Sequence, residues 1–187
     1  MSWFNIAQEI APQVQAGDIE PCIERLKNEM TKLPDSPFHM ATVLDFTNSP
    51  KEVASHFEKF IAQESTRLPL RAIYAETNGF DINPDRWFFD VFAYDTYGGH
   101  DDYGWLAEWK SDSYPSMTLA GMESLQRVYA REYVGDSKHG DAPHYASFLV
   151  LLKFQKLIKS SAPLIGNLQF PLLATSHDYD VIFEFNP

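Results

Sequence analysis

Two helices near the start of the chain are indicated by the spacing of hydrophobic residues. Apolar residues from Trp3 to Val14 recur at every third or fourth position, which is the period of one helical face, and Pro12 predicts a kink or a break in that segment. The same period runs from Ile19 to Met30 and predicts a second helix that ends before Pro34. Each segment therefore has one apolar side that needs a covering layer.

Two later helices have clearer signals. Ser49 and Glu52 form the Ser-x-x-Glu capping pattern around Pro50, which puts proline at the first helical position. A helix that begins near Asp141 has apolar residues from Tyr145 to Phe154 around most of its circumference, which is typical of a core helix covered on several sides. Its second half carries three lysines that suit the negative end of the helix dipole and require no ligand, namely Lys153, Lys156 and Lys159.

Six segments have the β-branched and aromatic content of strands. They are His39–Phe46, Leu70–Thr77, Arg86–Asp95, Tyr103–Lys110, Leu168–Thr175 and Asp180–Phe185. The three segments between residues 70 and 110 are joined by polar connections that contain glycine, which predicts an antiparallel meander. In the third of them, Trp105 and Trp109 fall on the same face of the strand.

A further helix is predicted after Pro115, capped by Ser116 or Thr118 and ending near Gly135. In the sequence, predicted helices lie before and after a block of consecutive predicted strands. This order predicts an α+β fold with a mainly antiparallel sheet. The sheet would combine the central three-stranded meander with the C-terminal strands and pack against about four to five helices. The length of 187 residues favours a single domain over residues 1–187.

The composition is that of an ordinary globular protein, with 44% hydrophobic and 22% charged residues. Cys22 is the only cysteine in the sequence, which excludes an internal disulfide and favours the reducing cytoplasm. Residues 1–15 contain no lysine or arginine and lack the apolar run of a signal peptide. The longest apolar run, Phe148 to Leu152, is far shorter than the roughly 20 residues of a membrane span. We therefore expect a soluble cytoplasmic protein.

The charge of the chain is strongly negative and unevenly distributed. Its formal value of −11 at pH 7 argues against binding to nucleic acid or to a membrane, because phosphate backbones and anionic lipids repel it. Residues 76–112 contain nine of the 26 acidic residues and two of the 15 basic ones, interleaved with three of the four tryptophans. Selective protein-binding surfaces combine aromatic anchors with charges that steer a partner of opposite sign.

The connection from Asp95 to Tyr103 is richer in chemistry than a hairpin turn requires, because it contains two tyrosines, three aspartates, a histidine and a Gly-Gly pair. The predicted partner-binding residues are Asp95, Tyr97, His100, Asp101, Asp102, Tyr103, Trp105, Glu108, Trp109 and Asp112. Strand alternation gives a simpler interpretation, in which the aromatic residues form the inner face of a sheet and the carboxylates form its solvated face.

No segment matches a catalytic or cofactor motif, so we predict no catalytic residue, no cofactor and no metal ion. The triplet His100–Asp102 and the segment His139–His144 contain metal-ligating residue types without the spacing of a zinc or calcium site. Ser176–Asp178 contains the residue types of a hydrolase triad, but on a strand the central His177 faces away from its neighbours.

The leading hypothesis is a cytoplasmic protein-binding module that occludes a basic protein partner through the region from Asp95 to Asp112, in the manner of an immunity-type inhibitor of a bacterial toxin. The alternative is a small-molecule or metal-dependent hydrolase that uses the carboxylates of the 95–103 connection and His100. A third hypothesis is a homodimer in which the aromatic face is the self-interface and the acidic residues form its rim.

Overall fold

The computed structural model describes residues 2–132 and 137–187, which form an α+β fold around one five-stranded sheet. The described α-helices are α1 (Trp3–Gln15), α2 (Ile19–Met30), α3 (Pro50–Glu64), α4 (Glu123–Glu132) and α5 (Ala142–Ser161). The strands are β1 (Ala72–Thr77), β2 (Phe88–Tyr94), β3 (Met117–Thr118), β4 (Leu172–Ser176) and β5 (Phe183–Phe185). Short 3-10 helices are η1 (Pro37–Thr42), η2 (Tyr103–Glu108), η3 (Ser137–His139) and η4 (Ala162–Leu164).

The sheet is mixed and mostly antiparallel, as the sequence predicts. Its strand order is β3-β2-β1-β4-β5, and only the pairing of β1 with β4 is parallel among the pairings of the described strands. The parallel pair arises because α5 carries the chain back along the sheet before β4 begins, whereas antiparallel neighbours need only a short connection. Both C-terminal strands are confirmed, although each is shorter than its predicted segment.

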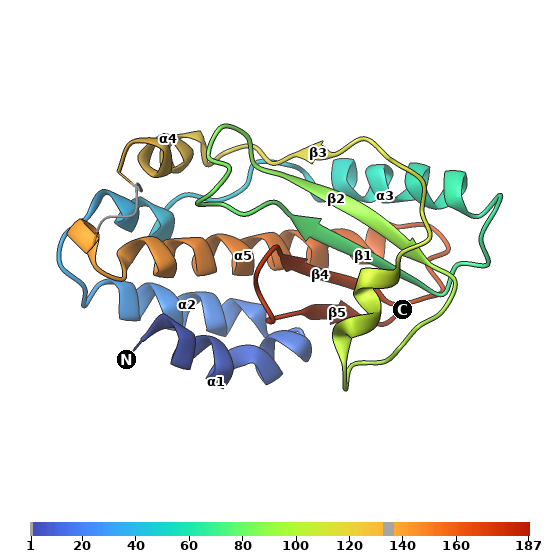
Figure 1. Ribbon diagram of the computed structural model, residues 1–187, viewed down its shortest axis with the longest axis horizontal. Helices are drawn as coiled ribbons and strands as arrows, with labels where there is room; N and C mark the ends of the chain where they lie inside the picture. The colour runs from blue at the N-terminus through green and yellow to red at the C-terminus, as the bar shows by residue number, and fades with distance from the viewer. Residues whose placement is uncertain (1, 133–136) are drawn as a thin grey trace.

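The main core lies between the helices and the inner face of the sheet. Alternation along β1 and β2 turns Ile73, Ala75, Phe89 and Val91 toward this core, where they join the buried sides of α1, α2, α3 and α5. In Figure 1 the long α5 passes behind the strands, with α1 and α2 stacked along its lower side. The prediction of α5 as the core helix is confirmed, because residues such as Phe148 are completely buried in it.

The outer face of the sheet carries a smaller apolar cluster. Ala72, Tyr74, Tyr94, Leu173 and Ile182 are buried there beneath η2 and the loop before it. In Figure 1, η2 lies in front of the sheet, on the side opposite α5. This cluster covers one end of the outer face, so the remaining surface of β1 and β2 is left half-exposed.

The capping pattern that the sequence predicts at the start of α3 is present in the structure. Ser49 Oγ accepts from the backbone N–H of Glu52 at 3.2 Å, and the Glu52 carboxylate accepts from the Ser49 N–H at 3.0 Å, which completes the capping box of α3. Cys22 is buried in α2, as its place in the apolar stripe indicates.

No helix within residues 2–132 and 137–187 combines the length and apolar character needed to cross a bilayer.

The predicted strand at His39–Phe46 is wrong, because this segment contains the 3-10 helix η1. Ser36 caps η1 by accepting from the N–H of Phe38, and Pro37 occupies its first position. His39 then bonds through its ring to the Ser36 and Met30 carbonyl groups. Local capping therefore overrides the β-branched content of the segment.

The predicted strand at Tyr103–Lys110 is also wrong. The three-stranded antiparallel meander is present, but its third strand is β3, at Met117–Thr118 beside β2. Asp102 accepts from the N–H of Gly104 at 2.8 Å and starts η2 instead. Trp105 packs edge-on against Tyr94 and is half-buried, whereas Trp109 is 51% exposed, so the two tryptophans do not share a face. The aromatic side chains of this segment find their apolar partners by folding over the sheet rather than by extending it.

The predicted helix after Pro115 begins later than expected. Met117–Thr118 forms strand β3 beside β2, and α4 begins only at Glu123. The chain turns at Gly121, where φ is +106° and an added Cβ would meet the carbonyl oxygen of Asp45 at 2.5 Å. The predicted end of the helix near Gly135 lies outside the described residues.

The far edge of β3 is covered by a side chain. The amide of Asn48 donates to the Thr118 carbonyl oxygen at 2.9 Å and accepts from the Ala120 N–H at 2.8 Å. The Thr47 N–H donates to the Ala120 carbonyl oxygen beside it. The segment before α3 is therefore fixed to the strand that closes the sheet.

Lys153 on α5 has a different role from the one suggested by the helix dipole. Its side chain is buried, and its ammonium group donates to the carbonyl oxygens of Ala41, at 2.8 Å, and Leu44, which fixes the end of η1 to α5. Burial lowers the pKa of this ammonium to about 8. The other two lysines reach acidic residues, with Lys156 near Asp45 and Lys159 on Glu20.

The Lys153→Met variant should change how stability depends on pH. Because the unfolded chain holds the lysine proton up to a pKa of 10.5 and the folded chain only to about 8, the free energy of unfolding of the unmodified protein should rise between these two values, by at most about 3 kcal/mol. The variant should lack this rise. Urea unfolding at several pH values measures both proteins, and tyrosine ionisation affects both equally; parallel curves would show that Lys153 keeps an ordinary pKa.

Candidate binding surface

Two carboxylates face each other on the half-exposed part of the outer sheet face. Glu76 of β1 and Asp90 of β2 are direct partners in the antiparallel register, and alternation places both on the outer face. Side chains directly opposite in a sheet have Cβ atoms roughly 5 Å apart, and like charges in that position are destabilising. A like-charged pair at this place is therefore more typical of a binding surface than of a fold optimised for stability.

One side of this pair is bordered by the end of β4. His177 Nδ1 lies 3.1 Å from Glu76 Oε1, and the histidine side chain is 59% exposed. A hollow of about 230 Å³ lies here, lined in part by Glu76, Asp90, Phe88 and His177. Burial, followed by the negative charge of Glu76, raises the pKa of Tyr74 on the neighbouring outer position, so this phenol stays protonated.

The other side of the pair opens onto a larger hollow at the edge of β2. β3 pairs only with Phe88 and Phe89 in the described structure, and the Lys110 N–H and Ser111 Oγ bond to the backbone of Ala93. Between these contacts the chain from residue 112 to residue 116 leaves the strand, and a hollow of about 400 Å³ lies beside Val91. Two carboxylates, Asp90 and Asp112, contribute to its lining.

Aromatic rings form part of the wall of this larger hollow. Phe92 and Trp109 lie with ring centroids 5.2 Å apart, and Phe92 also stacks on Tyr74. Tyr114 contributes a third ring to the lining. Asp90 Oδ1 accepts from Ser116 Oγ at 2.5 Å, which fixes the position of this carboxylate in the lining of the hollow. The hollow thus combines one exposed and two half-buried rings with negative charge.

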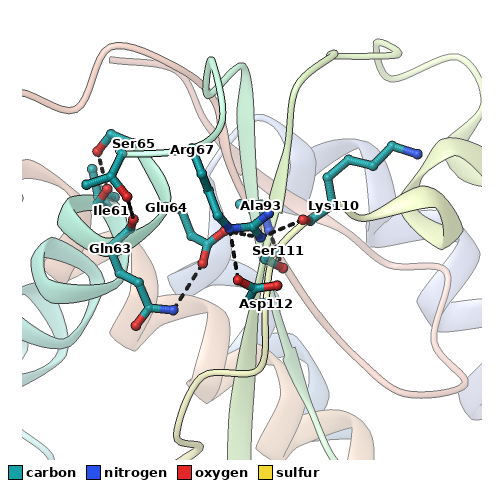
Figure 2. A network of polar contacts seen from close by, with 10 residues as sticks. Ile61, Gln63, Glu64, Ser65, Arg67, Ala93, Lys110, Ser111 and Asp112 are labelled. Carbon is teal, nitrogen blue, oxygen red and sulfur yellow. Dashed lines mark hydrogen bonds and ion pairs between the residues drawn. The ribbon is translucent and has the colours of Figure 1, made fainter.

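An ion-pair network fixes the segment that carries Trp109 and Asp112. Arg67, just after α3, contacts the buried carboxylate of Glu64 at 2.6 Å and Asp112 Oδ2 at 3.1 Å, and it donates to the Lys110 carbonyl oxygen at 2.6 Å. Figure 2 shows the guanidinium between these three acceptors. One arginine therefore holds the edge segment against α3.

The loop that follows β2 is fixed over the smaller apolar cluster by its tyrosines and Trp105. Tyr97 OH donates to Glu184 Oε1 on β5 at 2.6 Å, and burial together with this carboxylate raises the pKa of Tyr97. Gln15 donates to Tyr103 OH at 3.0 Å, and Trp105 Nε1 donates to the Gly99 carbonyl oxygen at 2.9 Å. These predicted partner-binding residues thus have structural contacts within the chain.

The other predicted residues of the loop are more open. His100, Asp101, Asp102 and Glu108 are exposed, and Asp102 also caps η2. Asp95 is half-buried at the end of β2. The structure therefore separates the exposed acidic residues from the half-buried rings of Tyr103 and Trp105, beside which the exposed Tyr97 is bonded to Glu184, and from the hollow that contains Trp109 and Asp112.

Three residues of the surface were absent from the predicted set. Asp90 and Glu76 are part of the acidic segment, and the alternation of Phe88, Asp90 and Phe92 on one face of a strand is a signal that identifies the first of them. His177 reaches Glu76 only because β4 lies parallel to β1, a pairing between distant segments. No local sequence pattern contains that information.

The segments with metal-ligating or triad residue types are dispersed. Among the described residues, no group of three His, Cys, Asp or Glu side chains is placed to hold a metal ion. His139 lies near Glu132 and Phe38, whereas His144 stacks on Trp3. Ser176 is buried and His177 is exposed, which agrees with their alternation along the strand.

No protein-family model, no curated protein and no solved structure matches this chain.

The Arg67→Ala variant should be destabilised by about 2 kcal/mol, because it leaves the buried Glu64 carboxylate without its cationic partner. Replacing Asp112 by Asn removes only an exposed pairing and should cost less than about 1 kcal/mol. Chemical denaturation of both variants measures the difference. Adding Glu64→Gln to Arg67→Ala should recover part of the loss; an Arg67→Ala variant as stable as the unmodified protein would contradict this account of the network.

Proposed function

We propose that this protein is a binding module that recognises a basic protein partner through its outer sheet face and the acidic loop beside it. The observation that carries the proposal is the hollow beside Val91, whose lining contains the carboxylates of Asp90 and Asp112 together with the exposed ring of Trp109 and two half-buried rings. Rings provide contact area at low conformational cost, and carboxylates select a cationic surface.

The loop from Asp95 to Tyr103 supports the proposal in a different way. His100, Asp101 and Asp102 are exposed, while Tyr97, Tyr103 and Trp105 hold the loop against the body of the protein. Exposed carboxylates on an anchored loop increase the rate at which a basic partner arrives, because their field acts before contact. The loop therefore steers the partner, and the hollow beside Val91 holds it.

Occlusion of a partner suits this arrangement better than chemistry. Asp102 caps η2 and Asp90 accepts from Ser116 Oγ, so these two carboxylates are held in fixed positions at the surface. Proteins that neutralise a cationic enzyme by covering it, such as immunity-type inhibitors of bacterial toxins, use the same combination of charge and rings. We extend the proposal to this type of inhibitor.

The decisive experiment is a kinetic one. Any protein that the immobilised chain retains at low salt is eluted, identified and purified. Stopped-flow fluorescence then measures the rate at which this protein associates with the chain. We expect a basic partner whose association rate falls at least about tenfold between about 50 and about 500 mM salt. The Asp101→Asn/Asp102→Asn variant should associate about two- to fivefold more slowly, because it removes two exposed charges. Its melting temperature should stay unchanged, because asparagine can keep the cap that Asp102 forms with the Gly104 N–H.

The matched control is Glu24→Gln/Glu29→Gln, which neutralises two carboxylates on α2, on the side of the sheet opposite the surface. These glutamates pair with Lys27 and Lys32, and the association rate should stay as it is. An association rate independent of salt, equal slowing by the control variant, or retention of the chain's own copies alone would contradict the proposal; the last result would identify the homodimer.

A further inference from the structure

We infer that the hollow beside Val91 is a receptor for one arginine side chain of the partner. The hollow is lined by Asp90, Phe92, Trp109, Asp112, Tyr114 and Ser116, together with their neighbours. Its volume of about 400 Å³ is at the small end of the range for ligand pockets, which suits a single long side chain. The inference rests on the proposed function, since the arginine belongs to the basic partner.

The protein's own Arg67 shows which acceptors hold a guanidinium at this edge of the sheet. Arg67 is bound by two carboxylates, Glu64 and Asp112, and by the Lys110 carbonyl oxygen. The acceptors surround the planar group, as Figure 2 shows. A guanidinium offers five N–H donors in a fixed plane and is well served by this set.

The hollow offers a similar acceptor set one step along the same edge, with Asp112 common to both. Asp90 provides a carboxylate of its own, and Asp112, which pairs with Arg67 through Oδ2, provides the shared one. Alternation along β2 turns the N–H and C=O of Val91 away from β1, in the same direction as the Ala93 groups that bond to residues 110 and 111. The departure of residues 112–116 from the strand leaves the Val91 carbonyl facing the hollow as the third acceptor.

The rings favour arginine over lysine. Trp109 is 51% exposed and lies 5.2 Å from Phe92, centroid to centroid, so about half of this side chain remains available for contact with a bound group. A guanidinium stacks on an aromatic face while it bonds to carboxylates at its edge, whereas an ammonium is a compact, strongly hydrated charge. On the same surface the guanidinium of Arg86 lies over the Phe88 ring, 4.9 Å from its centroid. This pair is an example, within the protein itself, of an arginine stacked on an aromatic ring.

The test is titration of the full chain with blocked arginine, N-acetyl-L-arginine N-methylamide, followed by two-dimensional NMR. We expect saturable shifts of the Val91 amide and the Trp109 indole N–H with a millimolar dissociation constant. Blocked lysine should bind at least about threefold more weakly. Blocked citrulline, which has the same shape without the charge, should produce no saturable shift at these two groups.

Variants locate the site. Asp90→Asn preserves the shape of the side chain and should weaken arginine binding at least about fivefold, because it removes one charge-assisted contact. Trp109→Ala removes an exposed ring and should also weaken binding, which keeps the test decisive if the first variant is poorly folded. Asp101→Asn, on the loop outside the hollow, is the matched control and should bind as the unmodified chain does.

The outcomes separate this inference from the proposed function. Equal binding of citrulline or lysine, shifts confined to the acidic loop, or equal weakening by Asp101→Asn would overturn the arginine site. A partner with salt-dependent association that binds Asp90→Asn as tightly as the unmodified chain would overturn it while leaving the proposed function intact. Saturable arginine binding at Val91 without any basic partner would instead leave the site standing and remove the function.

Discussion

The packing of α5 against the inner face of the sheet is the interaction on which the rest of the structure depends. Along this helix the buried side chains include Gln155, whose amide donates to the carbonyl oxygens of Ala174 and Val181, so the helix also orients the C-terminal strands. α1, α2 and α3 complete the same layer. The long helices cover the inner face. Among the residues that the structure describes, only η2 and the loop before it cover the outer face, so the surface around Glu76 and Asp90 is half-exposed.

That division gives the two faces different physical roles. On the inner face, buried apolar area stabilises the fold, and polar groups there are mostly bonded to backbone. On the outer face, the opposed carboxylates of Glu76 and Asp90 occupy positions where a neutral, β-branched pair would be more stable. Proteins retain such locally unfavourable arrangements at functional sites, and the outer face has this character whereas the core does not.

Periodic segments were the most predictable part of the molecule. The spacing of apolar residues identified α1 and α2 with nearly correct ends, and the starts of α3 and α5, because each helix buries one stripe or its whole surface against neighbours. The wrong strand predictions lie in segments where short-range hydrogen bonds compete with the strand pattern. The side chains of Ser36 and Asp102 cap 3-10 helices in segments whose residue types favour strands.

The candidate site was predictable in part. The acidic and aromatic character of residues 76–112 is a property of the sequence, and Trp109 and Asp112 do line one hollow. The sequence pattern could not show that Trp105 is half-buried against Tyr94, because that depends on how the loop folds back over the sheet. The contact of His177 with Glu76 and that of Arg67 with Asp112 likewise join residues far apart along the chain.

The side chain of Asn48 occupies the place where a further strand would lie beside β3. Its amide satisfies the Thr118 carbonyl and the Ala120 N–H, the groups through which another molecule would otherwise extend the sheet. Growth of the sheet by strand addition is therefore blocked on this side, which guards against edge-to-edge aggregation. Whatever docks next to β3 must do so through its side chains, since the main-chain route is already closed.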